Sequence, residues 1–269
     1  MTICVSVKVA EGLVLAADSA LMLEGSIKTP EGEKSSILQT FGFANKITRL
    51  KDYPVGIMSW GTGNIGDRSI QSLIMEFEYG YPEREKNKNH TVKAIADEIL
   101  SFIKERYYQA YDNELEKPEL GIFAGGYSAG EFFADEYSYV FPQSEEWEIA
   151  RPNMPDGRPS FGPNWFGMTD ALNRLIKGYD PNALKELVKR GVDKTIIQKW
   201  IDDGVSELRL IFDGMPLQDA IDFAEYAVQV VIGRYRFEVG PSLCGGEIDI
   251  AVITPRAFQW AKRKQWSIK

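Results

Sequence analysis

The stretch that decides the fold is residues 2–19, TICVSVKVAEGLVLAADS. Apolar side chains alternate with other side chains over residues 3–9, which is the period of a β-strand with two distinct faces. Residues 10–12 supply a tight turn, and the nearly continuous apolar run 13–17 predicts a buried strand that returns beside the first. Because this run stops abruptly at Asp18, we expect a carboxylate at the end of a buried strand.

Further strands are predicted where short apolar runs are bounded by turn residues. They cover residues 46–50 and 55–60, residues 120–127 and 131–135, and residues 247–254. Residues 24–36 are rich in Gly, Ser, Lys and Glu and are expected to form a long loop. Residues 141–165, rich in Pro, Asn and Gly, are expected to form an irregular excursion.

Helices are predicted where apolar residues recur every three or four positions. One helix is entered through residues 61–64, a second covers 91–111, helical signals run from 169 to about 204, and a last helix covers 216–235. No internal repeat or linker interrupts the chain. We therefore expect a single α+β domain over residues 1–269, in which two sheets are covered by helices.

The composition is that of an ordinary globular protein. Of 269 residues, 44% are hydrophobic and 26% are charged, which excludes long disorder and fibrous repeats. The formal net charge of −8 disfavours a nucleic-acid partner, because such binding usually needs a basic face. No stretch approaches the roughly 20 apolar residues of a membrane helix, and no secretory signal is visible. We expect a cytoplasmic protein without a membrane partner.

Two cysteines and one histidine limit the chemistry. Cys4 and Cys244 cannot make a disulfide framework or a four-ligand zinc site, so neither a metal nor a cofactor is expected. His90 follows the polar residues 86–89 and is expected to be a solvated loop residue. Any nucleophile in this chain is therefore expected to find its base in a group other than imidazole.

Thr2 directly follows Met1. Initiator methionine is commonly removed before a small residue, and its removal would leave Thr2 with a free α-amine. Such an amine has an unperturbed pKa of about 7.7–8.0. It could therefore take the proton of the threonine hydroxyl and replace a histidine base.

The residues around Thr2 resemble the opening of proteasome β-type subunits and of their bacterial relatives HslV and Anbu. In that family the N-terminal threonine is the nucleophile, and an aspartate ends the returning strand at the offset where Asp18 stands here. Residues 45–50, NKITRL, resemble the lysine-bearing strand of the family, with Lys46 as the lysine. Residues 59–63, SWGTG, occupy the place where the first helix of the family opens.

A second part of the resemblance lies near the C-terminus. Residues 239–249, VGPSLCGGEID, are similar to the loop and last core strand of the family. The resemblance is clear over residues 2–80 and 237–254 and is only architectural between them.

The resemblance implies a four-layer α-β-β-α sandwich of two antiparallel sheets, the N-terminal nucleophile hydrolase fold. Residues 178–212 have no counterpart in the compact core of that family and are expected to form a helical insertion of two short helices. Apolar residues on more than one face of these helices suit either packing within the chain or contact with a neighbouring subunit.

The implied activity is that of a threonine-type peptidase, which hydrolyses peptide bonds through an acyl-enzyme ester on Thr2 once Met1 is removed. Two alternatives remain: a transpeptidase or amidase that uses the same acyl-enzyme, and a non-catalytic structural subunit. The implied partners are further copies of the chain in a ring or helical assembly and a peptide or unfolded protein as substrate. An ATPase activator is a further candidate partner.

The family roles carry over to three residues besides Thr2. Lys46, buried beside Asp18, would lower the barrier to deprotonating the Thr2 hydroxyl, unless Lys46 and Asp18 form only a structural ion pair. Gly61, at a strand-to-helix turn, would offer its backbone N–H to the developing oxyanion. A glycine there also lets the substrate backbone approach closely.

The chain departs from the family pattern in two segments. The family has a Gly-Ser-Gly segment near the nucleophile, where this chain has residues 167–169, GMT; Thr169 could supply the hydroxyl or simply cap the following helix. The family's Asp-x-x-Ser-Gly-Gly becomes PSLCGG, in which Pro241 cannot replace an aspartate. That part of the hydrogen-bond network is then missing or rerouted, with Ser242 as the candidate. Trp60, beside the expected oxyanion site, is expected to narrow the pocket.

Overall fold

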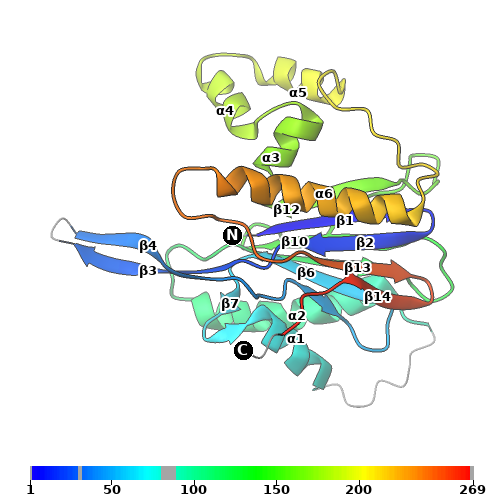
Figure 1. Ribbon diagram of the computed structural model, residues 1–269, viewed down its shortest axis with the longest axis horizontal. Coiled ribbons are helices and arrows are strands. Elements are labelled where there is room, and N and C mark those ends of the chain that lie inside the picture. Colours follow the sequence, from blue (N-terminus) through cyan, green and yellow to red (C-terminus); the bar gives the residue numbers. More distant parts are fainter. Residues whose placement is uncertain (1, 30–31, 80–88, 267–269) are drawn as a thin grey trace.

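Two five-stranded sheets form the centre of the molecule, which the computed structural model describes over residues 2–29, 32–79 and 89–266 (Figure 1). The first sheet has the order β12-β1-β2-β13-β14 and contains β1 (Ile3–Val9), β2 (Gly12–Ala17), β12 (Gly162–Gly167), β13 (Asp249–Thr254) and β14 (Ala257–Lys262). The second has the order β11-β10-β9-β6-β5 and contains β5 (Ile47–Arg49), β6 (Val55–Gly61), β9 (Leu120–Gly126), β10 (Asp135–Phe141) and β11 (Glu148–Ile149). Neighbouring strands run antiparallel in both sheets.

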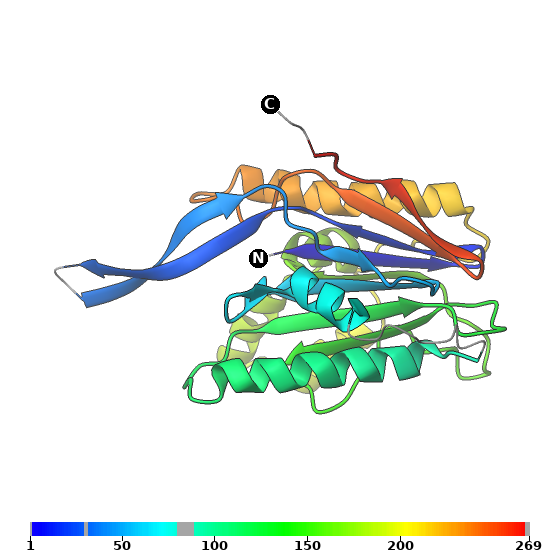
Figure 2. The same cartoon turned by 90° about the horizontal axis from the view of Figure 1, so that it is seen from below.

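Helices and two small ribbons complete the described part. The helices are α1 (Ile70–Tyr79), α2 (Val92–Tyr111), α3 (Asp170–Leu172), the π-helical turn η1 (Asn173–Lys177), α4 (Pro181–Lys189), α5 (Lys194–Asp202) and α6 (Leu217–Arg236). One ribbon pairs β3 (Leu21–Thr29) with β4 (Gly32–Phe41), and the other pairs β7 (Asn64–Ile65) with β8 (Arg68–Ser69). The β3–β4 ribbon extends away from the sheets in both views (Figures 1 and 2).

Figure 2 shows α6, the first sheet, the second sheet and α2 in succession. Three apolar clusters fill the spaces between them: one between α6 with α3 and the first sheet, one between the sheets, and one between the second sheet and α1 with α2. Successive side chains of β2 point to opposite faces of the first sheet, so the strand contributes to two clusters. Val14 and Ala16 pack in the α6 cluster, whereas Leu13, Leu15 and Ala17 pack between the sheets.

The sequence predicted the opening strands and the two long helices correctly. β1 and β2 pair antiparallel, with Cys4 opposite Ala17. The helix predicted at 91–111 is α2, whose first turn is capped because the Thr91 side chain accepts the N–H of Ala94. The helix predicted at 216–235 is α6. No helix in the described ranges has the length and apolar character needed to cross a membrane.

One loop prediction is wrong, and a second is wrong only in part. Residues 24–36 contain most of the β3–β4 ribbon rather than a long loop, with residues 30 and 31 outside the described part. In the described sheets, β3 and β4 pair only with each other. Their sequence therefore lacks the apolar alternation that is typical of a strand packed on a core. The excursion predicted at 141–165 includes β11 and the start of β12, in which Pro163 pairs with Val7.

Three further predictions differ from the structure: one strand was misplaced, one helix begins later than expected, and one strand was missed. The strand predicted at 131–135 is wrong, because β10 begins at Asp135 and the two phenylalanines before it, Phe132 and Phe133, are exposed. The first helix begins at Ile70 and not at residues 61–64, because the β7–β8 ribbon turns the chain first. β14 was not predicted at all.

The insertion predicted around residues 178–212 contains α4 and α5. Figure 1 shows them beyond α6, on the side away from the sheets. Both helices begin with an aspartate cap: Asp180 accepts the N–H of Asn182, and Asp193 accepts the N–H of Thr195. Neither helix contains a buried residue, so these two helices add little to the core.

A buried polar cluster joins the two sheets at Glu136 of β10. Its Oε1 accepts hydrogen bonds from Ser6 Oγ (2.6 Å) and Asn164 Nδ2 (3.2 Å), and Arg151 Nε lies 4.0 Å from its Oε2. Burial raises the pKa of the Glu136 carboxyl above its ordinary value of 4.5, although Arg151 and Lys8 act in the opposite direction.

The pKa of Glu136 predicts how stability depends on pH. Because the folded state holds this proton more tightly than the unfolded state, the contribution of Glu136 to stability is present at low pH and is lost as pH rises above its ordinary value of 4.5. We expect Glu136→Gln to remove this titration, with a change in slope of at most about 1.4 kcal/mol per pH unit. Urea unfolding of both proteins across the acidic range measures the slope; parallel curves would contradict the prediction.

Candidate active site

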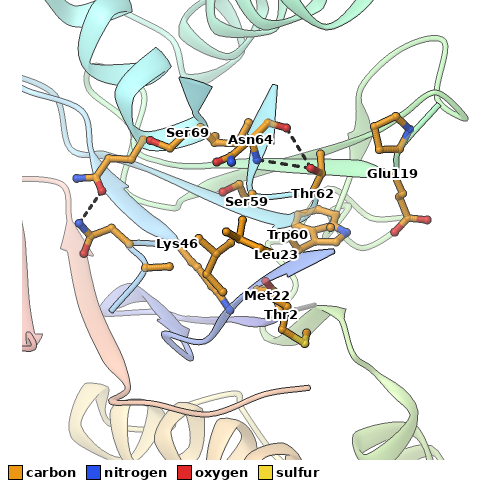
Figure 3. Close-up of a pocket in the computed structure, with 18 of the residues that line it drawn as sticks. Thr2, Met22, Leu23, Lys46, Ser59, Trp60, Thr62, Asn64, Ser69 and Glu119 are labelled. Atoms are coloured by element: carbon orange, nitrogen blue, oxygen red, sulfur yellow. Dashed lines mark hydrogen bonds between the residues drawn. The ribbon is translucent and has the colours of Figure 1, made fainter. Parts of the chain in front are cut away.

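Thr2 lies directly before β1, in the wall of a cavity of about 620 Å³ (Figure 3). Its side chain is largely buried, and its carbonyl accepts the N–H of Met168 (2.8 Å). Gly167, opposite Ile3, approaches so closely that a Cβ there would lie 2.1 Å from the Thr2 carbonyl oxygen. The φ of +84° at Gly167 also favours glycine, so the contact that fixes the Thr2 backbone depends on that residue.

Asp18 follows β2 and is 1% exposed. Its Oδ1 accepts hydrogen bonds from Lys46 Nζ (2.6 Å) and from the N–H of Ile3 (3.1 Å). Its Oδ2 accepts the N–H groups of Ala20 (3.2 Å) and Gly245 (3.0 Å). One carboxylate thus connects the start of β1, the segment before β5 and the loop before β13, and these four donors compensate its burial.

Lys46 lies directly before β5, is 6% exposed and lines the same cavity as Thr2. The Lys46 ammonium and the Ile3 N–H both donate to Asp18 Oδ1. This shared oxygen connects the ammonium to the Thr2–Ile3 peptide. Figure 3 shows the Lys46 side chain pointing toward Thr2. A positive charge in this position favours loss of a proton from a neighbouring hydroxyl.

Gly61 ends β6 and lines the cavity together with Thr2 and Lys46. Its φ of +83° lies in the left-handed region, and a Cβ there would lie 2.3 Å from the carbonyl oxygen of Glu119. Only glycine fits both conditions. The turn is held next to this point because the N–H of Thr62 donates to the same Glu119 carbonyl (2.7 Å).

Thr169 and Ser242 are not among the residues that line this cavity. Thr169 occupies the N-cap position of α3, but its side chain makes no capping bond and instead accepts Asn173 Nδ2 (3.2 Å). Ser242 is exposed and donates to the carbonyl of Cys244 (2.7 Å), which helps to shape the loop that carries Gly245. Thr2, Lys46 and Gly61 therefore line one cavity, and Asp18 is bonded to Lys46 behind its wall, whereas Thr169 and Ser242 lie outside it.

Trp60 contributes part of the cavity wall, but its ring lies between the sheets. It stacks on Phe166 with 4.7 Å between ring centroids. The ring also fills the space above Gly121, where a Cβ would lie 1.8 Å from the indole. Most of the bulk of Trp60 is thus accommodated by core packing and not by the cavity.

Both cysteines are poor competitors for the role of nucleophile. Cys4 and Cys244 are buried, and burial raises the pKa of both thiols, that of Cys244 to about 12. At neutral pH both are therefore protonated thiols, which react slowly with electrophiles.

Among the described residues, no group of three or more His, Cys, Asp or Glu side chains is placed so that it could hold a metal ion. His90, expected to be a solvated loop residue, is half-buried: its Nε2 lies 3.0 Å from the carbonyl oxygen of Tyr127, and its ring meets Tyr53 edge-on. Residues 86–88 of its polar run lie outside the described part.

Sequence reasoning missed several cavity residues. Leu21, Met22 and Leu23, at the base of β3, form one wall, and Asn45 and Gln71 contribute amide groups. Leu21, Met22 and Leu23 follow Asp18 closely in the chain, and that position was the signal that could have identified them. The amides carried no such signal, since their contact depends on how α1 packs against the segment before β5.

Solved structures with a similar fold are known, although no similar sequence was found. No protein-family model matches the chain, and a search of curated proteins gave no match. Among solved structures, "Anbu (ancestral beta-subunit) from Yersinia bercovieri" matches with a TM-score of 0.51 and 12% identity, over 96% of this chain and 86% of that chain. "Helical Assembly of the Anbu Complex from Pseudomonas aeruginosa" matches with a TM-score of 0.50 and 14% identity, over 94% and 81% of the two chains. The chain thus shares the proteasome-like fold of the Anbu proteins.

Proposed function

We propose that this protein is an N-terminal threonine hydrolase that cleaves peptide bonds, with Thr2 as the nucleophile after removal of Met1. The observation that carries the proposal is the pairing of Lys46 Nζ with Asp18 Oδ1 at 2.6 Å, on an oxygen shared with the N–H of Ile3. This arrangement brings an ammonium group to a cavity wall that also contains Thr2.

The proposal includes the fold. The succession of α6, two antiparallel sheets and α2 supports the four-layer α-β-β-α sandwich of the N-terminal nucleophile hydrolases, in a single domain. In that arrangement Thr2, before β1, and Asp18, after β2, lie at the same end of the first sheet, because β1 and β2 pair antiparallel with Cys4 opposite Ala17.

The reaction proceeds through two acyl transfers. The Thr2 Oγ attacks the substrate carbonyl while its proton passes to the free α-amine, and the charge of Lys46 favours this loss. The backbone N–H of Gly61 stabilises the oxyanion. The C–N bond breaks as the leaving amine takes the proton, and water then hydrolyses the ester to release the acid and restore Thr2. Transfer of the acyl group to an amine in place of water would make the same site a transpeptidase.

Thr169 and Ser242 have supporting roles in this proposal. Ser242 shapes the loop through the Cys244 carbonyl, and the N–H of Gly245 in that loop binds Asp18 Oδ2. Thr169 holds Asn173 close to the Met168 N–H that binds the Thr2 carbonyl. Both residues position backbone around the site without contact to the substrate.

We also propose that the chain works as a homo-oligomer in the cytoplasm. The similar Pseudomonas aeruginosa structure is described as a helical assembly. The exposed helices α4 and α5 and the projecting β3–β4 ribbon offer this chain surfaces for contact between copies.

The proposed mechanism predicts the N-terminus of the active protein. We expect the active form to begin at Thr2, because an amide at the Thr2 nitrogen cannot accept the hydroxyl proton. N-terminal sequencing of protein labelled with a β-lactone should give Thr-Ile-Cys in all labelled molecules. Protein that starts only at Met1 and is nevertheless active would rule out the mechanism.

A further inference from the structure

Two side-chain amides meet in the wall of the cavity that contains Thr2. Asn45, which precedes Lys46, donates through Nδ2 to Oε1 of Gln71 in α1 (2.5 Å). Both residues line the cavity and both are half-buried. The direction of this hydrogen bond decides which amide atoms remain for a ligand.

Arg263 sets that direction. Its Nη2 donates to Asn45 Oδ1 (2.9 Å) and its Nη1 donates to Oδ2 of the buried Asp249 (3.2 Å), while its guanidinium lies over the ring of Trp260 (4.0 Å). A guanidinium group has donors only, so the Asn45 carbonyl must turn toward Arg263. The Asn45 NH₂ group then faces Gln71.

The same reasoning extends to Gln71. Since Asn45 presents a donor, Gln71 must present its carbonyl oxygen to Asn45, and its Nε2 turns away from the pair. Within the described ranges this Nε2 has no hydrogen-bond acceptor. Gln71, a residue of the cavity lining, therefore carries an oriented donor whose direction is fixed from Asp249 through Arg263 and Asn45.

We propose that Gln71 Nε2 is a binding site for an uncharged carbonyl oxygen of a peptide substrate, oriented by Arg263 acting through Asn45. This inference rests on the proposed function and names a contact in the same cavity. The charged residues of the described lining are Lys46, which pairs with Asp18, and Glu119, which is exposed. A peptide carbonyl matches a neutral amide donor without needing a charged partner.

The test compares two electrophiles on Gln71→Met, which keeps the length of the side chain and removes the donor. We expect the inhibition constant of a peptide epoxyketone to rise about tenfold, the size of one lost hydrogen bond, with the maximal rate of inactivation little changed. A small β-lactone that carries no peptide should acylate Thr2 at the wild-type rate. The matched control is Gln218→Met, an exposed glutamine of α6 that bonds Asp222 outside the cavity.

Two further variants test the orientation. Asn45→Asp replaces the donor by an acceptor and should turn the Gln71 carbonyl into the cavity, so we expect an increase in the inhibition constant at least as large. Arg263→Lys keeps a group with donors only and should retain near-normal binding, whereas Arg263→Gln, which pairs with Asn45 in either direction, should not.

The outcomes separate the two proposals. Failure of the β-lactone to label Thr2 in the wild-type protein would remove the proposed function. If the β-lactone labels Thr2 normally but Gln71→Met leaves the epoxyketone inhibition constant unchanged, the donor site alone is overturned. The same holds if the wild-type protein is labelled normally but shows no saturable epoxyketone binding. Equal losses in Gln71→Met and Gln218→Met would show that the effect is not local to the cavity.

Discussion

Replacement of Thr2 by alanine is expected to abolish peptide hydrolysis and covalent labelling by a β-lactone, with a fall in rate of at least about a thousandfold. The reason is that the Thr2 hydroxyl is the attacking group of the proposed mechanism. The fold should persist, because the Thr2 carbonyl still accepts the Met168 N–H and β1 keeps its partners on both sides. Intact-mass measurement after labelling gives the extent of covalent modification, and the midpoint of urea unfolding shows whether the fold is retained.

Thr2→Ser is the matched control, since it keeps a hydroxyl at the same position and is expected to retain labelling at a reduced rate. The main competitors are the thiols of Cys4 and Cys244, whose pKa values are raised by burial. Peptide mapping distinguishes them from Thr2. Labelling that survives Thr2→Ala on either cysteine would make the nucleophile assignment wrong.

Local sequence predicted the elements whose pattern follows from one buried face. β1 and β2 could be predicted because β1 has an alternating and β2 a continuous apolar pattern. Both patterns are typical of a strand buried between α6 and the second sheet. α2 and α6 were readable because each has an apolar stripe facing a sheet. Asp18 stood out because a carboxylate ends an apolar run.

The remaining elements depend on contacts that no local pattern contains. β12 includes Pro163 and is placed by its pairing with β1, which comes from a distant part of the chain. The β3–β4 ribbon is paired only with itself in the described sheets, so its residues followed no core pattern.

The site divides in the same way. Thr2, Asp18, Lys46 and Gly61 were predicted from a family resemblance. In the structure Thr2, Lys46 and Gly61 line one cavity, and Asp18 lies buried behind its wall, bonded to Lys46. Asp18 and Lys46 bond to each other although they are 28 residues apart in the sequence. Their contact therefore depends on how the two sheets pack. Arg263 could not be predicted from sequence, because its bond to Asn45 joins positions 218 residues apart.

The buried pair of Lys46 and Asp18 leads to the second large effect. Removal of either charge leaves the other uncompensated, and we expect Lys46→Ala to lower the free energy of unfolding by roughly 3–5 kcal/mol because both side chains are almost fully buried. The rate of Thr2 acylation per folded molecule should fall further than stability alone explains, because the ammonium also favours deprotonation of the Thr2 hydroxyl.

The control variants separate catalysis from structure. Lys8→Ala removes another buried lysine, near the Glu136 carboxylate and outside the cavity lining, and should cost stability while acylation per folded molecule stays normal. Lys46→Arg should not restore acylation, since a planar, longer guanidinium does not fit the place of a compact ammonium that bonds Asp18 at 2.6 Å. A purely structural pair predicts the opposite order: a lower unfolding midpoint, normal acylation and partial rescue by arginine. Unfolding midpoint and acylation rate measured on the same preparations of these variants decide between the two, and normal acylation in folded Lys46→Ala would remove Lys46 from the mechanism.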